Sequence, residues 1–410
     1  MSASTHAVAP TGATQLGINS RAAIIGCFVL LIGFGLIDQV AGLRQSALYV
    51  LGAAAGLVLY HAAFGFTSAW RVFISDRRGE GLRAQMFMLA IAVVLFFPAL
   101  SSGIVLGQPV QGYVFPIGIS LLFGSFVFGV GMQLGGGCAS GTLYTVGGGS
   151  VRMVLTLAAF IVGSAWGAAD LPWWSSLPHL TPISLVKTWG LVPALLVNLL
   201  VFAAIAAATV ALERRRHGRL AQTDLSPHTG YARLFRGPWP MLAGAAALAV
   251  MNFATLVLAG RPWGVTSAFA LWGSKAALAL GVPVASWHYW SAPAASAALH
   301  SSVLKDVTSV MDFGIMIGAF LAAALAGRFS PGFRIPLRSA LGAILGGLML
   351  GYGARLAYGC NIGSYFSGIA SGSLHGWVWM GMAFAGNIAG THLRPLFGLA
   401  VEKTPRLTSC

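Results

Sequence analysis

Two cysteines lie in glycine-rich interruptions of long apolar runs. Cys138 lies in GGGCASG (135–141) and Cys360 in YGCNIG (358–363). Glycine permits positive φ and close approach to the backbone, and a helix that restarts after a break offers free N–H groups with a partial positive charge. A thiol is a small, polarizable group that can meet a soft sulfur atom, which a hydroxyl would match poorly. Together these features point to a sulfur-bearing anion as ligand.

An internal repeat relates the two cysteines. GVGMQLGGGCASG (129–141) matches GYGARLAYGCNIG (351–363) with the cysteines in register, and FGFTSAW (64–70) matches WGVTSAF (263–269). A single cysteine among glycines is more often explained by packing, because glycines let membrane helices approach and a buried cysteine behaves as a small hydrophobe. Two cysteines at matching positions of a repeat favour a function. Cys27 and Cys410 have no comparable surroundings.

The composition predicts an all-α polytopic membrane protein. Of the 410 residues, 57% are hydrophobic and 8% charged, against about 25% charged in soluble domains. Apolar windows of 18 or more residues recur, each long enough to cross a bilayer as a helix. The short alternating segments of a membrane β-barrel are absent from the sequence.

The apolar runs predict about ten transmembrane helices, near 22–41, 46–64, 84–106, 117–134, 153–170, 190–212, 239–260, 310–327, 338–356 and 374–394. The net charge of +15 comes from 24 Lys and Arg against 9 Asp and Glu. Ten crossings place the main basic clusters on one side, which the positive-inside rule makes the cytoplasm. We therefore expect a multi-pass protein of the bacterial inner membrane with both termini cytoplasmic.

The expected organisation is two inverted repeats. A disordered cytoplasmic tail (1–20) precedes the first transmembrane repeat (21–212), a cytoplasmic linker (213–238) follows, and the second repeat (239–400) ends in a cytoplasmic tail (401–410). Under this topology the helix before FGFTSAW runs inward and the helix before WGVTSAF runs outward. Broken helices of inverted repeats commonly form the substrate site of transporters. The inversion requires residues 264–308 to form a re-entrant turn and an external loop.

The four glycine-containing breaks supply the candidate substrate-path residues. Within the membrane, the N–H and C=O groups of non-helical backbone need hydrogen-bond partners from protein or from a water-filled cavity. Such backbone is therefore found along transport pathways. The small and polar residues of the breaks, predicted to line the path with Cys138 and Cys360, are Gly65, Thr67, Ser68, Gly136, Gly137, Ser140, Gly141, Gly264, Thr266, Ser267, Gly359, Asn361, Gly363 and Ser364.

Two basic residues near the breaks are further candidates. Arg355 replaces Gln133 of the first repeat, and Lys275 follows the third break. Intramembrane cations are costly unless they face a cavity, a partner or an anion, although a lysine can instead extend to the interface. The sequence contains no cysteine pair typical of zinc sites, no nucleotide-binding loop and no hydrolase motif. No metal, cofactor, catalytic residue or nucleic-acid partner is predicted.

GRPWGVTSAFALWGSK, GGGCASG and YGCNIGSYFSG together resemble the YeeE/YedE family of sulfur-compound permeases, over residues 45–395. The resemblance implies an hourglass-shaped helical protein in which four short helix-and-loop elements meet at the centre. It also implies thiosulfate uptake along cysteines that hydrogen-bond the anion without a stable covalent bond, and a cytoplasmic TusA-like sulfurtransferase as partner.

The first break departs from the family pattern. Family sequences typically read like RFCFASAFR there, whereas this chain reads AFGFTSAWR, with Gly65 in the cysteine position. Either the substrate differs or two thiols suffice.

The leading hypothesis is a permease that imports thiosulfate or a related sulfur anion through a central path lined by the four breaks. The alternative is a membrane sulfurtransferase or sulfur sensor carrying a cysteine persulfide, which requires an accessible thiol of low pKa.

Overall fold

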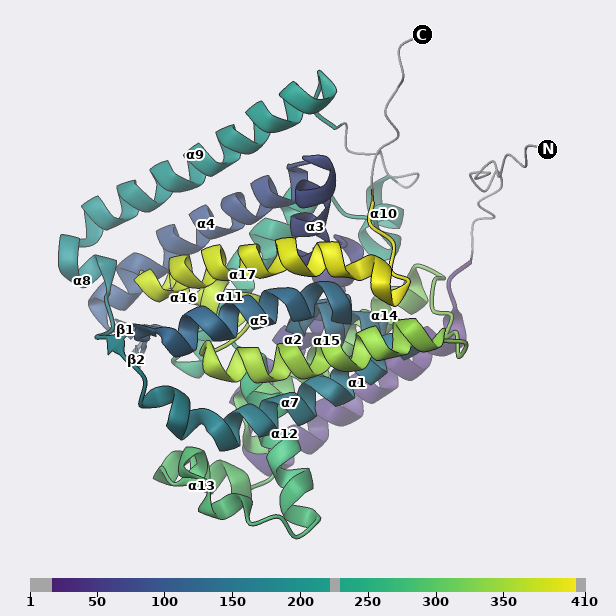
Figure 1. Ribbon diagram of the computed structural model, residues 1–410. Coiled ribbons are helices and arrows are strands. Elements are labelled where there is room, and N and C mark those ends of the chain that lie inside the picture. Colours follow the sequence, from purple (N-terminus) through teal and green to yellow (C-terminus); the bar gives the residue numbers. More distant parts are fainter. Residues whose placement is uncertain (1–16, 222–228, 403–410) are drawn as a thin grey trace.

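The computed structural model describes residues 17–221 and 229–402 of the chain, and these residues form a helical bundle (Figure 1). Its long helices are α1 (Ser20–Ala41), α2 (Leu43–His61), α4 (Glu80–Ser102), α5 (Ile119–Gly135), α7 (Val151–Ser175), α9 (Leu191–His217), α11 (Met241–Ala259), α14 (Val307–Leu325), α15 (Leu337–Leu356) and α17 (Leu374–Leu393). Each coincides with a predicted span. A helix pairs its own backbone N–H and C=O groups, which is necessary because the bilayer core offers them no hydrogen-bond partner.

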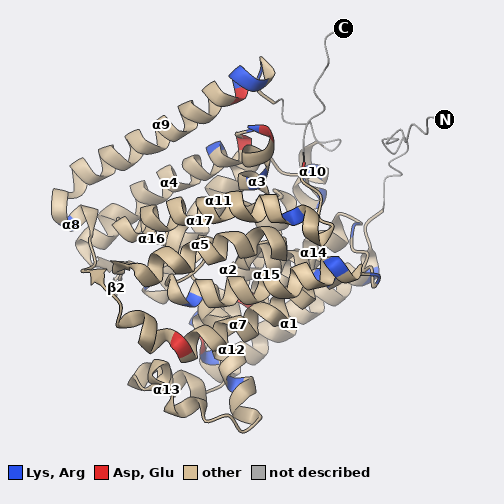
Figure 2. Cartoon of the chain, viewed as in Figure 1, with Lys and Arg blue, Asp and Glu red and all other residues tan. Residues whose placement is uncertain are grey.

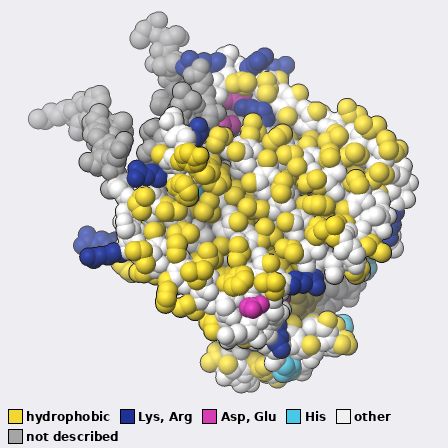
Figure 3. Space-filling view, turned by 180° about the vertical axis from the view of Figure 1, so that it is seen from behind, with side chains coloured by type: hydrophobic (Ala, Val, Ile, Leu, Met, Phe, Trp, Pro, Cys, Tyr) yellow, Lys and Arg dark blue, Asp and Glu magenta, His cyan; other side chains and the backbone are white. Residues whose placement is uncertain are grey.

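The lengths and composition of these helices confirm the all-α membrane class. Within the described ranges, nine helical segments are long and apolar enough to cross a membrane. The predicted span 374–394 corresponds to α17, which lies within the bundle but is not one of the nine. Hydrophobic side chains cover much of the surface seen in Figure 3. Large apolar residues such as Leu31, Leu200 and Phe28 are exposed. This surface suits lipid tails.

Shorter elements fill the breaks or connect the long helices. Those at the breaks are α3 (Phe66–Asp76), α6 (Ala139–Gly147), α12 (Thr266–Ala279) and the π-helical η4 (Asn361–Phe366), which runs into α16 (Ser367–Ala370). The connecting elements are α8 (Leu185–Trp189), α10 (Gly230–Arg236), α13 (Pro293–His300), η1 (Val284–Ser286), η2 (His288–Trp290), η3 (Val303–Lys305) and η5 (Arg394–Phe397). The expected linker 213–238 thus contains the end of α9 and all of α10, with residues 222–228 outside the description.

The connections divide between the two ends of the bundle. At one end, strand β1 (Ile104–Val105) pairs with β2 (Gln108–Pro109), and β3 (Ile117–Gly118) pairs with β4 (His179–Leu180). At the other end, Arg78 and Arg83 contact the buried Glu213 carboxylate at 3.2 and 2.8 Å. Many Lys and Arg residues lie at this second end (Figure 2). We call it the basic end, and the opposite one the β end.

Both ends of the described chain lie at the basic end. The backbone N–H of Asn19 donates to the Ala324 carbonyl at 3.0 Å. Near the other terminus, the Arg71 guanidinium binds both carboxylate oxygens of Glu402 at 2.6 Å. An even number of crossings therefore separates them. The tails predicted at 1–20 and 401–410 fall largely outside the described residues.

Corresponding helices of the two repeats run antiparallel. At the β end, Ser120 at the start of α5 donates to the Leu356 carbonyl at the end of α15, at 2.8 Å. At the basic end, the Trp239 N–H just before α11 donates to the His61 carbonyl at the end of α2, also at 2.8 Å. Arg44, at the start of α2, donates to the Leu258 carbonyl near the end of α11. Since α5 corresponds to α15 and α2 to α11, the repeats are inverted, as predicted.

The segment 264–308 follows the re-entrant prediction. Its longest helix, α12, has 14 residues, about 21 Å at 1.5 Å per residue, which is shorter than the roughly 30 Å hydrocarbon core. The rest of the segment is made of short helices, and α13 lies outside the bundle below α12 in Figure 1.

Glycines bring the helices of the two repeats into backbone contact. Gly52 of α2 lies against the backbone of Met311 in α14, and a Cβ built on Gly318 of α14 would collide with the Ala53 carbonyl oxygen. Such close approach is typical of membrane helices, whose association depends on packing and on small residues at the interface.

The α5 break exposes carbonyl groups that two arginines bind. Arg152 donates to the carbonyls of Leu134 and Gly135 at 2.7 Å each and to the Ser339 hydroxyl at 2.8 Å. Arg394 donates to the Gln133 carbonyl at 2.7 Å. Cations at a helix C-terminus also complement its partial negative charge. The α15 break instead uses a hydroxyl, because Ser364 donates to the Ala357 carbonyl at 2.6 Å.

Replacing Gly318 with leucine is expected to lower the melting temperature in detergent and the yield of monodisperse protein, because the side chain would separate α14 from α2. Overpacking of this kind costs about 1–3 kcal/mol or more. Gly381→Leu is the matched control, since a Cβ there meets open space. Equal melting temperatures for the two variants would contradict the close α2–α14 packing.

Arg152→Met is expected to destabilise the protein by about 2–4 kcal/mol, because buried carbonyls of the α5 break lose their partner. Arg338→Met, at an exposed arginine of the same end, serves as control. Thermal unfolding followed by tryptophan fluorescence measures both. An Arg152→Met variant as stable as its control would show that the break does not depend on this guanidinium.

Candidate functional site

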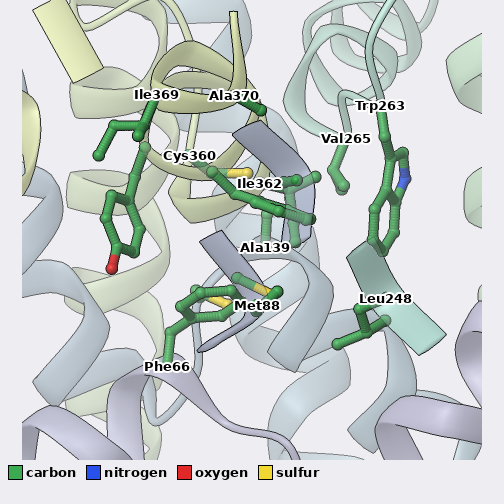
Figure 4. Close-up of a cluster of buried hydrophobic side chains, with 14 of the residues drawn as sticks. Phe66, Met88, Ala139, Leu248, Trp263, Val265, Cys360, Ile362, Ile369 and Ala370 are labelled. Carbon is green, nitrogen blue, oxygen red and sulfur yellow. The ribbon is translucent and has the colours of Figure 1, made fainter. Parts of the chain in front are cut away.

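The four short helices at the breaks begin at one place in the middle of the bundle. Figure 4 shows the first residue of α3, Phe66, and of α6, Ala139, close to Val265 and Cys360, which directly precede α12 and η4. All four belong to one buried cluster. The N-terminal ends of four helical segments of at least nine residues therefore converge, and each contributes N–H groups and a partial positive charge.

Cys138 is the N-cap residue of α6 and is 2% exposed. Its sulfur accepts the Gly141 N–H at 3.4 Å and lies 3.4 Å from the Ser140 hydroxyl. Gly136 adopts φ +94, and a Cβ there would lie 2.7 Å from the Arg152 guanidinium. The glycine thus lets the arginine reach the break. Gly137 is similarly confined, since a Cβ there would lie 3.1 Å from the α6 backbone.

Cys360 is the N-cap residue of η4 and is fully buried. The preceding turn requires unusual backbone angles, with φ +61 at Tyr358 and +152 at Gly359. A Cβ on Gly363 would meet open space. The fold therefore presents the two predicted thiols in equivalent N-cap positions of the inverted repeats.

Asn361 has a buried side-chain amide at this centre that is free to bind a ligand. It is fully buried, and neither its amide nitrogen nor its amide oxygen has a hydrogen-bond partner among the described residues. Its counterpart in the first repeat is Ala139. Since buried polar groups are nearly always hydrogen-bonded, this amide is suited to bind a ligand or water. Ser364 lies close by but already caps the α15 break.

The first break places hydroxyls beside Gly65. Thr67 is 4% exposed, and its hydroxyl has no partner in the described part of the chain. Ser68 donates to the Gly65 carbonyl at 3.2 Å. Gly65 and Ser68 border a cavity of about 160 Å³ that Arg78 also lines, toward the basic end. Gly65 has φ −114, which any residue can adopt. A Cβ there would lie 2.5 Å from the Ser68 hydroxyl, so a cysteine requires this hydroxyl to rotate but leaves the backbone unstrained.

The third break joins a polar cluster at the β end. Ser267 donates to the Thr308 hydroxyl of α14 at 2.9 Å. Arg261 donates to the same hydroxyl and to that of Tyr113, each at 3.2 Å. A Cβ on Gly264 would lie 3.3 Å from the Tyr113 hydroxyl. Thr266, the first residue of α12, is 3% exposed.

The structure directs Lys275 and Arg355 away from the breaks. The Lys275 ammonium donates to the carbonyls of Leu299 and Ser301 at 2.6 Å each, at the end of α13. The Arg355 guanidinium donates to the Tyr289 hydroxyl and lies 5.1 Å from the centre of that ring. Both side chains bind the segment 284–301 and not the backbone of the breaks.

Sequence reasoning missed two groups that join the breaks. Arg261 precedes the third break within the quoted GRPWGVTSAF motif, so its charge beside a glycine break was a usable signal. Asn252 accepts the Trp263 N–H at 2.9 Å and donates to the Ser367 hydroxyl at 3.1 Å, which links α11, the third break and α16. An asparagine inside an apolar run indicates such a role, since polar groups in membranes are costly.

The chemistry available at this centre is the binding of a small anion. It offers helix N-termini, neutral hydroxyls, an amide and two thiols, and the described residues contain no group of three or more His, Cys, Asp or Glu side chains placed to hold a metal ion. Oxygen atoms of an anion can accept the N–H and O–H groups, while a terminal sulfur atom can contact a thiol.

Comparison with known proteins agrees with this chemistry. The family model described as "Sulphur transport" matches residues 61–389. The thiosulfate transporter TsuA of Spirochaeta thermophila is 26% identical over 354 residues, covering 80% of this chain and 92% of that protein. TsuA of Escherichia coli is 25% identical, covering 82% and 90%. The probable transporter YedE of Escherichia coli is 32% identical over 173 residues, 41% of each chain.

Because the family model spans most of the chain, including all four breaks, this protein belongs to the sulphur transport (YeeE/YedE) family.

Proposed function

We propose that this protein is a permease that imports thiosulfate, or a closely related sulfur anion, across the bacterial inner membrane. The observation that carries the proposal is the convergence of four helix N-termini, two of which have the buried residues Cys138 and Cys360 at their N-caps. Aligned N–H groups favour an anion, and the thiols favour one with an accessible sulfur atom. The relatives named as thiosulfate transporters support the same substrate class.

The anion would follow a path from the β end to the basic end. Arg261 would attract it at the β end, where this guanidinium donates to the hydroxyls of Tyr113 and Thr308. At the centre, Cys138 and Cys360 would contact its terminal sulfur, while the Asn361 amide and the Thr67 hydroxyl would donate to its oxygens. The cavity beside Gly65 and Arg78, which opens toward the basic end, would receive it on the other side. Because both cysteines are buried, the described conformation is a closed one.

The proposed direction of transport rests on the distribution of basic residues between the two ends of the bundle. The basic end, which also carries both ends of the described chain, would face the cytoplasm under the positive-inside rule. A TusA-like sulfurtransferase that receives the anion there would complete the pathway. A stable mass increase on Cys138 or Cys360 after incubation with a sulfur donor would instead favour the persulfide-carrying alternative.

Cys138→Ala and Cys360→Ala are each expected to reduce thiosulfate uptake about tenfold or more, since losing one contact worth about 1.4 kcal/mol changes an equilibrium tenfold. Uptake of radiolabelled thiosulfate in cells that lack other importers measures the effect. Cys27→Ala is the matched control, because Cys27 is exposed on α1. Normal uptake by both central variants would contradict the proposed contacts between the thiols and the anion. No uptake by the wild type would contradict the proposal that thiosulfate is the substrate.

Gly65→Cys is expected to react with a membrane-impermeant thiol reagent applied to the basic end, and thiosulfate is expected to slow this reaction. The reason is that Gly65 borders the basic-end cavity whereas Cys138 and Cys360 are buried. Labelling is measured in a chain with alanine at Cys27 and Cys410. Faster labelling from the β end, or no protection by thiosulfate, would contradict the proposed exit.

A further inference from the structure

Asp312 is a buried acid without a hydrogen-bond partner. It lies in α14, is fully buried, and neither of its carboxylate oxygens has a partner among the described residues. Glu213, the other fully buried acid among the described residues, differs because Arg78 and Arg83 neutralise it. An unpaired carboxylate inside a membrane protein is costly and usually functional. Its neutral, protonated form costs much less.

The position of Asp312 on α14 connects the β-end polar cluster with the central thiols. Thr308, four residues earlier and so on the same helix face, binds Ser267 and Arg261. Four residues later, the Met316 carbonyl lies against Gly147, at the end of α6 opposite to its N-cap Cys138. The Asp312 carboxyl also lies within electrostatic range of Cys360. Asp312 therefore lies on α14 between the Thr308 cluster and the level at which α14 contacts the end of α6.

The charged and titratable groups on the elements packed against α14 leave Asp312 unpaired. Several are held elsewhere: Lys275 by carbonyls near α13, Tyr49 by the Val29 carbonyl, and Asp306 by Ser309. The charged and titratable residues on these elements are Arg21, Cys27 and Asp38 on α1, Arg44, Tyr49, Tyr60 and His61 on α2, Cys138 and Tyr144 at α6, Tyr231, Arg233 and Arg236 on α10, Lys275 on α12, Lys305 and Asp306 at η3, Arg261 near Thr308, and Cys360 before η4.

We propose that Asp312 binds a proton that crosses the membrane together with the sulfur anion, so that this protein is a proton-coupled symporter. This proposal rests on the proposed function. A charged carboxylate would repel an approaching anion, whereas the protonated acid is neutral and can donate its O–H to an anion oxygen. The proton would enter from water at the β end, bind Asp312, and leave to water at the basic end after the anion departs.

The proposed transport cycle carries one proton across the membrane with each anion. For the dianion thiosulfate, one co-transported proton leaves a net movement of one negative charge. With the membrane potential clamped at zero, each unit of pH difference is expected to change the thiosulfate accumulation ratio about tenfold, because one pH unit is a tenfold ratio in proton activity.

The test uses the full-length protein in liposomes that contain a pH-sensitive dye and have their potential clamped by potassium and valinomycin. An inward gradient of labelled thiosulfate, without any imposed pH gradient, is expected to acidify the lumen. Asp312→Asn, which resembles the protonated acid, is expected to keep thiosulfate exchange and to lose this acidification. Asp312→Glu is expected to restore it, and Asp38→Asn, at an exposed acid of α1, is expected to behave as wild type.

Thiosulfate entry without acidification in the wild type would overturn the coupling while leaving the proposed function intact. Acidification by Asp312→Asn equal to wild type would overturn the assignment to Asp312, and dependence of entry on sodium instead of protons would overturn the choice of ion. Failure of labelled thiosulfate to enter at all would overturn the proposed function and this inference with it.

Discussion

The breaks at the centre of this protein depend on hydrogen bonds to carbonyl groups that a continuous helix would satisfy itself. Lipid offers no partner for such groups. In the first repeat, Arg152 and Arg394 bind the last carbonyls of α5, and in the second, Ser364 binds the Ala357 carbonyl of α15. Because the carbonyl groups at the ends of α5 and α15 have hydrogen-bond partners, the short helices that follow can begin at the centre. Their N–H groups are then directed to a common point.

The two repeats use this shared geometry differently. The break after α5 in the first repeat is bound by two guanidinium groups, Arg152 of the same repeat and Arg394 of the second. The first repeat also borders the cavity beside Gly65 toward the basic end. The second uses neutral hydroxyls and carries Asn361, whose buried amide has no partner among the described residues, where the first has Ala139. Inversion therefore gives a symmetric set of helix N-termini with unequal side chains. A path that accepts an anion on one side and releases it on the other requires different side chains on its two sides.

Much of this arrangement could be predicted from the sequence because it follows from local patterns. Uncharged runs long enough to cross a bilayer predict the long helices, and the matching motifs around Cys138 and Cys360 predict the inverted repeats. Side-chain directions could not be predicted in the same way. Lys275 and Arg355 stand near the breaks in sequence, but their partners belong to the folded segment 284–301. The position of Arg152 in the sequence suggests an interfacial anchor, and its partners at Leu134 and Gly135 become visible only once α5 and α7 are packed.

The central claim is that a sulfur anion binds where the four short helices meet. The most direct measurement is an experimental structure with the selenium analogue selenosulfate bound, in which anomalous scattering locates the selenium atom. The account predicts selenium in contact with the sulfur of Cys138 or Cys360. An ordered analogue bound only in a surface cavity, with the central cysteines unoccupied, would contradict it.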